Sequence, residues 1–396
     1  MNKLFDIINV EIDKIFQEIV SIRRKIHQNP ELSFSEYKTS ELIRSFLKKN
    51  SIRFDILAET GTIGYIGNGK PCIALRADID ALPIKEETGL DFASTNDGVM
   101  HACGHDMHTS ILLGASKILK NLEPKIKGTI KLIFQPGEEK LPGGAIQLIN
   151  EGVLENPKPD FVFGQHVDPE NETGVISISE GTILASADEL YITLHGNQAH
   201  AAQPHLGNDL ILASSSLIMN LQSIVSRGRN PLLPGVLSIT SIHGGSATNI
   251  MPDKVELMGT LRSFDQNWRK QAIKLIETNI KNISNIYNIE YQFKPLLGYP
   301  PLNNDDKAVE YIRKVSYDYL GEKKVRTFVP KMWAEDFAYY SQQVPSAFWF
   351  LGVKSKQNSQ IIPLHNSQFN PDEGAIKTGI AIMTLAAYKY FALNKV

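Results

Sequence analysis

Histidines and a cysteine crowd into one short segment of the chain, residues 101–108. The segment reads HACGHDMH, and Cys103 is one of only two cysteines in the sequence. Thiolate and imidazole are ligands that zinc and other transition metals bind. Apolar residues then recur at helical spacing, so Cys103 and His105 are expected at a helix start, where the helix dipole favours a thiolate. The segment predicts a metal site; a buried cysteine beside a capping histidine is the structural alternative.

Acidic side chains and histidines also follow the apolar runs that have the character of strands. Asp78 and Asp80 follow one run, Glu138 and Glu139 a second, His166 a third and His365 a fourth. In open α/β sheets, ligands bind outside the carboxyl ends of the strands, so these side chains are expected to converge on one crevice. A single such residue is usually a surface charge or a helix cap. Several strands that end in this way favour a shared site.

Adjacent Glu138 and Glu139 suit a division of labour in a metal-dependent hydrolase. One carboxylate binds the ion, and its neighbour accepts the proton of a metal-bound water. A solvated acidic pair is the alternative, and it is our interpretation of the pair Glu86-Glu87. The residues Phe-Gln-Pro-Gly that precede Glu138 make an exposed face less natural there.

The elements that must position these residues alternate between strand and helix. Strand-like runs cover residues 72–76, 130–134 and 160–163, helical patterns cover 111–119 and 145–154, and a further strand and helix are expected at 347–353 and 375–391. This order predicts an α/β fold with a mixed or parallel sheet covered by helices.

A segment of different character lies between these two groups of elements. Strands are expected at 189–194, 236–242 and 255–262, a helix at 210–225, and a turn-rich return at 298–304. We therefore predict a discontinuous catalytic domain of residues 1–183 and 302–396. Residues 184–301 are predicted to form an inserted, smaller α+β domain.

Composition excludes several classes of partner. The 396 residues include 41 Lys and Arg and 43 Asp and Glu, a net charge of −2, which provides no global basic field for nucleic acid or anionic lipid. Two cysteines far apart in sequence argue against a disulfide framework and favour a reducing compartment. Acidic residues interrupt the apolar positions near the N-terminus, as a signal peptide would not, and no apolar run is long enough to span a membrane. We expect a cytoplasmic protein.

A set of motifs, in order along the chain, resembles the M20 metallopeptidases. They are RRKIH and NPEL within residues 23–32, RADIDALP at 76–83, HACGHD at 101–106, FQPGEE at 134–139, AHAAQPH at 199–205 and LHN at 364–366. The nearest resemblance is to the branch of hippurate hydrolases, N-acyl-amino-acid amidohydrolases and auxin-conjugate (IAA-amino acid) hydrolases. It implies a zinc-peptidase-type catalytic domain with an inserted domain that acts as a lid and dimerises.

The resemblance also implies roles for single residues. The ligands of two divalent ions, manganese, zinc, cobalt or nickel, would be Cys103, His105, Glu139, His166 and His365. Glu138 would be the general base. Asp80 or Asp78 would be the acid that orients a ligand beside the metals. Asp80 is the better match, because Ala-Leu-Pro follows it directly, and Asp78 stays open.

In the lid, His200 resembles the histidine that stabilises the oxyanion in the active site of the partner subunit of a homodimer. Asn249 and Arg262 resemble the residues that hold the substrate carboxylate, a task for which the forked guanidinium is suited. A turn-stabilising asparagine and a surface ion pair are the structural alternatives. The chain departs from many relatives at Gly137, where they have alanine, and at Ala199, where glycine often precedes the lid histidine.

The functional hypothesis is hydrolysis of the amide bond in N-acyl-L-amino acids, either hippurate-like or N-acetyl substrates, by a metal-activated water with Glu138 as the base. Deacetylation of N-acetyl-diaminopimelate, or hydrolysis of small peptides or conjugates, is the alternative within the family. A non-catalytic module that binds metal or ligand is the alternative from a different class. Only a small-molecule substrate and a second copy of the chain are expected as partners.

Overall fold

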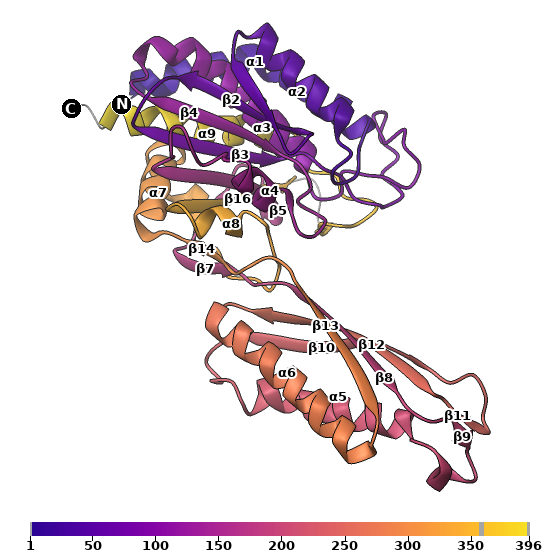
Figure 1. Cartoon of the computed structure of the whole chain (residues 1–396). Helices are drawn as coiled ribbons and strands as arrows, with labels where there is room; N and C mark the ends of the chain where they lie inside the picture. Colours follow the sequence, from indigo (N-terminus) through magenta and orange to yellow (C-terminus); the bar gives the residue numbers. More distant parts are fainter. Residues whose placement is uncertain (1, 356–359, 394–396) are drawn as a thin grey trace. The chain divides into compact units, whose positions relative to one another are not determined.

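The computed structural model describes residues 2–355 and 360–393, and the chain divides into two compact units (Figure 1). The first unit comprises Met1–Gly181, Asn303–Val329 and Asp336–Val396, and the second comprises Thr182–Leu302 and Pro330–Glu335. The short segment Pro330–Glu335 joins the second unit through backbone hydrogen bonds, from Lys331 to Ile183 (3.0 Å) and from Ala185 to Trp333 (2.8 Å). Among the described residues, no helix has the length and apolar character needed to cross a membrane.

An eight-stranded mixed sheet forms the centre of the first unit, in the order β1-β2-β4-β3-β5-β16-β6-β15. Its strands are β1 (Arg53–Leu57), β2 (Gly61–Gly67), β3 (Cys72–Asp78), β4 (Thr129–Gln135), β5 (Phe161–Glu172), β6 (Ile176–Ser177), β15 (Val325–Arg326) and β16 (Ser346–Lys354). The neighbouring strands β4, β3, β5 and β16 run parallel to one another. Their carboxyl ends therefore meet at one edge of the sheet.

These parallel strands carry nearly continuous apolar runs because both of their faces are covered. Every residue of β3 and β4 is buried, and so is all of β16 except its last residue. The expected strands in this unit are present. The strand β5 is longer than the apolar run at 160–163 indicated, so His166 lies inside the strand and not after it.

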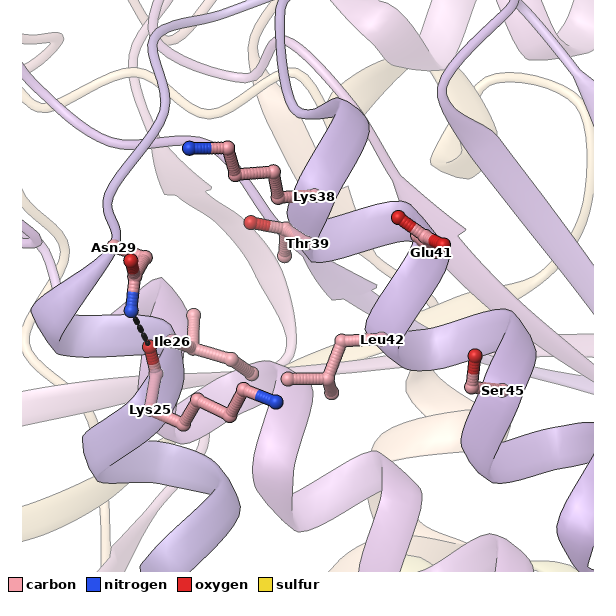
Figure 2. A pocket seen from close by; sticks show the side chains of 8 residues that line it. All are labelled: Lys25, Ile26, Asn29, Lys38, Thr39, Glu41, Leu42 and Ser45. Atoms are coloured by element: carbon pink, nitrogen blue, oxygen red, sulfur yellow. Dashed lines mark hydrogen bonds between the residues drawn. The ribbon is translucent and has the colours of Figure 1, made fainter.

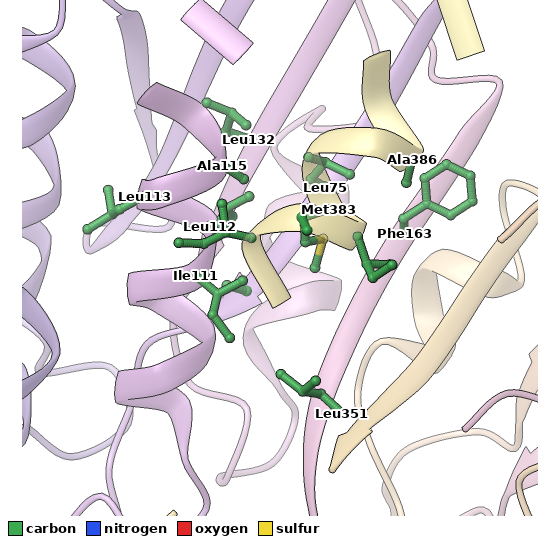
Figure 3. Packing of buried hydrophobic residues seen from close by; sticks show 14 of the residues in the cluster. Leu75, Ile111, Leu112, Leu113, Ala115, Leu132, Phe163, Leu351, Met383 and Ala386 are labelled. Atoms are coloured by element: carbon green, nitrogen blue, oxygen red, sulfur yellow. The ribbon is translucent and has the colours of Figure 1, made fainter. Parts of the chain in front are cut away.

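Helices α3 and α9 pack against each other and against the sheet, and α1 packs on both. Figure 3 shows their interface, in which Ile111 and Leu112 of α3 and Met383 of α9 meet Leu75 and Leu132 of the sheet. The helices of this unit are α1 (Asn2–Gln28), α2 (Tyr37–Lys49), α3 (His105–Leu122), α4 (Gly144–Asn150), α7 (Asp306–Leu320), α8 (Ala338–Ser341) and α9 (Ala375–Leu393).

The second unit has its own antiparallel sheet and its own core. Its sheet has the order β10-β12-β8-β13, and α5 and α6 pack on it. The elements are β8 (Asp188–His195), β9 (Ala199–His200), α5 (Leu210–Ser226), β10 (Gly235–Gly244), β11 (Ile250–Met251), β12 (Lys254–Ser263), α6 (Gln266–Tyr287) and β13 (Glu290–Leu297). A separate two-stranded sheet pairs β7 (Gly181–Leu184) with β14 (Leu302–Asn304), at the two ends of the segment Thr182–Leu302. Buried and exposed residues alternate along β8, as expected for a sheet with one covered face.

Truncation of a core residue should destabilise the first unit strongly. Ile111 is 0% exposed, and replacing it with alanine removes apolar contacts and leaves a cavity, so Ile111→Ala should lower the free energy of unfolding by about 2–5 kcal/mol. Ile56 on β1 is 52% exposed and serves as the matched control. Denaturant-induced unfolding measures both variants, and an equal loss in the two would contradict the assignment of the core.

Candidate metal centre and active site

The chemically active residues of the first unit gather at the carboxyl edge of the parallel strands. Asp78 ends β3, the pair Glu138-Glu139 follows β4, and His166 lies in the middle of the long strand β5. The loop after β16 reaches the same place, because the backbone N–H of His365 donates to the carbonyl of Ala102 (2.9 Å). The topology therefore brings together residues that lie far apart in the sequence.

Cys103 lies at the centre of this group. Its sulfur is 3.4 Å from Nε2 of His166 and 3.3 Å from Nε2 of His365. Two sets of possible ligand atoms, each with its members within 4.8 Å of one another, share this cysteine: Cys103 with His105 and His166, and Cys103 with Glu139 and His365. All of the ligand candidates from the sequence thus belong to two adjoining triads.

Two buried atoms show that these residues fit a metal ion. Nε2 of His105 makes no hydrogen bond among the described residues, and Oε1 of Glu139, 3.9 Å away, makes none either, although Nε2 of His365, another candidate ligand, lies 3.2 Å from it. A buried polar atom without a partner destabilises a fold by roughly 1–3 kcal/mol. A divalent cation between the two atoms would satisfy both, and a set of imidazole, thiolate and carboxylate groups is typical of zinc and its neighbours.

Asp80 orients His105 toward this position. Nδ1 of His105 donates to the backbone oxygen of Asp80 (2.9 Å) and is 3.2 Å from its Oδ1, which leaves Nε2 directed at the cluster. The other carboxylate oxygen of Asp80 accepts the backbone N–H of Glu139 (2.9 Å). A carboxylate that fixes the ring of a metal-binding histidine is a common arrangement in metal sites.

Asp78 has a different partner, His108, which our interpretation of the sequence did not assign. Nδ1 of His108 donates to Asp78 (2.6 Å), and its Nε2 accepts the backbone N–H of Val167 (2.9 Å). Both ring nitrogens are therefore occupied, so His108 supports the middle of β5 and is not free to bind an ion, although it lies within ligand distance of His105. The position of His108, one helical turn after His105, places both rings on one face of the helix, and this spacing could have identified His108 from the sequence.

Glu138 is buried, and its carboxylate lies within 4.8 Å of the ligand atoms of His105 and Glu139. The strand that precedes it is held by Asp336, which accepts hydrogen bonds from Nη2 of Arg76 (2.8 Å) and Nε2 of Gln135 (2.8 Å). Asp336 thereby ties the carboxyl ends of β3 and β4 together beneath the site.

The electrostatics of the cluster favour a positive ion. Burial, and then the nearby carboxylates, raise the pKa of the Cys103 thiol well above its ordinary value. Burial opposes charge on the His105 ring, but Asp78 and the other carboxylates outweigh it and raise the pKa of His105 to about 10. The expected effect of the α3 dipole on the thiol is outweighed by burial, and a bound cation is what would stabilise the thiolate.

The lid candidates lie in the second unit. His200 of β9 pairs with Ile250 of β11, and the N–H of Ala201 donates to the carbonyl of Asn249 (3.0 Å), so His200 and Asn249 are neighbours. Nδ1 of the exposed His200 accepts the N–H of Ala202 (3.0 Å), which leaves the ring proton on Nε2 when the ring is neutral. Arg262 lies on β12, away from that pair of strands, and is half-buried.

A cavity of about 420 Å³ lies between α1 and α2 and contains none of the clustered residues (Figure 2). It is lined by Lys25, Ile26, Asn29, Lys38, Thr39, Glu41, Leu42 and Ser45. Most of these side chains are polar, and they offer no group of metal ligands. We therefore assign the chemistry to the strand edge and not to this cavity.

Comparison with known proteins agrees with this geometry. The profile of the Peptidase family M20/M25/M40 matches residues 74–389. N-acetyl-L-cysteine deacetylase of Bacillus subtilis is 39% identical over 370 residues, which cover 93% of this chain and 86% of that protein. IAA-amino acid hydrolase ILR1-like 4 of Arabidopsis thaliana is 39% identical over 383 residues, which cover 95% of this chain and 86% of that protein.

Among solved structures, the Bacillus subtilis protein YXEP, described as a dinuclear metal-binding peptidase of the M20 family, superimposes with a TM-score of 0.82. It is 31% identical and covers 96% of this chain and 99% of its own. The fold and the candidate ligand clusters found here agree with that likeness. This chain therefore belongs to the M20 peptidase family and is a metal-dependent amidohydrolase.

Proposed function

We propose that this chain releases L-amino acids from N-acyl-L-amino acids, hippurate-like or N-acetyl, with Glu138 as the general base. The observation that carries the proposal is the position of the Glu138 carboxylate beside the ligand atoms of His105 and Glu139. The names of the relatives, N-acetyl-L-cysteine deacetylase and IAA-amino acid hydrolase, also describe amino acids joined to an acyl group.

Two divalent ions are the proposed cofactors, and manganese, zinc, cobalt and nickel all suit these donors. Cys103 would be shared between the two triads, one completed by His105 and His166 and the other by Glu139 and His365. When bound, the ions supply Lewis acidity that polarises the scissile carbonyl and lowers the pKa of water toward about 7. Asp80 would hold His105 in the orientation that this binding requires.

Glu138 would move one proton in the reaction. Its carboxylate would take the proton of the attacking water as the carbon–oxygen bond forms, and would return that proton to the amine nitrogen as the carbon–nitrogen bond breaks. Burial at the strand edge keeps the carboxylate away from bulk water. The adjacent Glu139 is directed at the ligand cluster, so the two carboxylates would serve different roles.

The lid residues would bind the charged parts of the substrate. His200 carries its proton on Nε2, the form that can donate a hydrogen bond to the oxyanion, and His200 of the partner subunit would do so. Asn249 and Arg262 would hold the substrate carboxylate. The guanidinium of Arg262 makes no hydrogen bond with a side chain among the described residues, which leaves it available for such a bidentate contact.

A second copy of the chain is the proposed partner of the second unit. Leu212 and Met219 lie two turns apart on α5 and are 54% and 73% exposed, and Ile242 on the edge strand β10 is 46% exposed. Exposed apolar side chains of this kind are typical of an interface. The proposed location is the cytoplasm, which suits two buried and unpaired cysteines.

Replacing Glu138 with glutamine should abolish turnover and leave metal binding intact. The amide cannot accept the proton, so kcat should fall by about 10²- to 10⁴-fold. The assay screens N-acetyl-amino acids and hippurate with each of the four metals, and metal content is measured beside it. Retained activity in Glu138→Gln would contradict the assignment of the base.

The same screen with the unmodified chain distinguishes the alternative functions. Turnover of N-acetyl-diaminopimelate alone would support the alternative substrate, and no turnover would support a non-catalytic module.

Replacing each of the two cysteines with alanine should have different effects on metal content. Cys103→Ala removes the sulfur shared by both triads, so metal affinity should weaken by more than about 10-fold. Cys72→Ala changes an equally buried, unpaired thiol at the start of β3 and should leave the metal content unchanged. Elemental analysis after dialysis measures both variants; a Cys103→Ala protein that retains its full metal complement would exclude the shared ligand.

His200 should act across the subunits of the dimer. His200→Ala should lower kcat without loss of metal. Mixing His200→Ala with Glu138→Gln chains should restore about one quarter of the normal activity, because half of the dimers are mixed and each mixed dimer has one intact site. No restoration after verified subunit exchange, or sedimentation that shows monomers only, would contradict this role.

A further inference from the structure

The side chain of Glu36 does not serve the helix that it precedes. Glu36 is the residue immediately before α2, where a short polar side chain normally accepts the first free N–H groups of the helix. Here Glu31 accepts those groups instead, from the backbone of Lys38 (3.0 Å) and of Thr39 (2.9 Å). The carboxyl group of Glu36 is fully buried and points elsewhere.

Glu36 binds the loop that carries Glu138. Its Oε1 accepts the backbone N–H of Gly137 (2.8 Å) and of Phe34 (2.8 Å), and its Oε2 accepts the hydroxyl of Thr60 (2.8 Å). Gly137 is the residue directly before Glu138. One buried carboxyl group thus joins the N-terminal segment, the turn before β2 and the active-site loop.

The aromatic ring of Phe34 also packs closely against Gly137. Gly137 has φ +60°, and a Cβ atom there would lie 2.2 Å from Cε1 of Phe34. Phe34 itself has φ +65°, which is uncommon for a residue other than glycine, and its N–H is one of the two that Glu36 accepts. The conformations of residues 34 and 137 are therefore coupled through a steric contact and a shared hydrogen-bond acceptor.

We infer that Glu36 is a positioning residue for the hydrolysis, and that it holds the Gly137 amide so that the next residue, Glu138, stays directed at the metal cluster. This inference rests on the proposed role of Glu138. Asp80 makes the matching contact on the far side, where it accepts the N–H of Glu139 (2.9 Å). Glu36 and Asp80 together therefore hold the loop on both sides of Glu138.

The contact depends on an oxygen acceptor and not on a negative charge. Oε1 accepts the backbone N–H groups of Gly137 and Phe34, and Oε2 accepts the hydroxyl of Thr60, a group that can donate or accept. Burial, and then the carboxylate of Asp80, raise the pKa of Glu36 to about 7, which agrees with a group that need not be ionised. A glutamine has the same oxygen and should replace Glu36, whereas an alanine should not.

The test compares Glu36→Ala and Glu36→Gln in the metal-loaded enzyme. Glu36→Ala should lower kcat by about 10- to 100-fold, because small displacements of a catalytic group are this costly, with KM within about twofold and full metal content. Glu36→Gln should stay within about twofold of the original kcat. Hydrogen exchange in the metal-free protein supplies a second readout: peptides that contain Gly137 should exchange faster in Glu36→Ala only.

Glu31→Ala is the matched control, since it removes a carboxylate with backbone contacts from the same segment but not from the active-site loop. It should lower the Tm and leave kcat unchanged. Gly137→Val is the second variant if Glu36→Ala does not fold: a β-branched side chain at φ +60° beside Phe34 should lower kcat with metal retained, and adding Phe34→Ala should restore part of the loss. Unchanged kcat in Glu36→Ala or in Gly137→Val, equal kcat losses in Glu36→Ala and Glu31→Ala, or no rescue by glutamine would overturn the inference.

The exchange measurement separates this inference from the proposed function. If Glu138→Gln retained activity while Glu36→Ala loosened the Gly137 peptide, the role of the base would fail and the contact of Glu36 with the loop would stand. If the Gly137 peptide did not respond to Glu36→Ala, the inference itself would fail, whatever the result for Glu138.

Discussion

Burial of polar ligand atoms without partners is the constraint on which the rest of the structure depends. Nε2 of His105 and Oε1 of Glu139 are removed from water and make no hydrogen bond among residues 2–355 and 360–393, and the polar neighbour of Glu139 at 3.2 Å is the ring nitrogen Nε2 of His365, itself a candidate ligand. Such atoms persist in a fold only where another group offsets the loss of hydration. Cations are suited to do so at a site that also holds a buried thiol and further carboxylates.

The parallel sheet explains how so many ligand atoms reach one place. The strands β4, β3, β5 and β16 run in one direction, so the segments that leave them carry their side chains to a common edge. Two of the candidate ligands are supported from another element: Asp80 contacts the ring of His105, and His108 accepts the backbone N–H beside His166. These supporting contacts are themselves buried, which favours a fixed orientation of the candidate ligands.

The strands and the convergence of the ligands could be predicted because they follow from apolar runs and from the residues directly after them. Polar contacts between residues far apart in the sequence could not be predicted in this way. Asp78 and Asp80 differ in their partners, His108 and His105, and the sequence did not supply this difference. Glu86, interpreted as solvated, contacts Nε2 of the buried His27 (3.2 Å). Glu36 lies 101 residues from Gly137, and no local pattern links them. Sequence periodicity reports the burial of a residue but not the identity of its polar partner.

Crystallographic location of the ions tests the central claim most directly. Crystals grown with zinc or manganese and measured on both sides of the metal absorption edge should show two anomalous peaks per chain. Both peaks should lie within about 2.5 Å of the sulfur of Cys103, one beside His166 and the other beside His365. A single peak, or two peaks that do not share Cys103, would contradict the account.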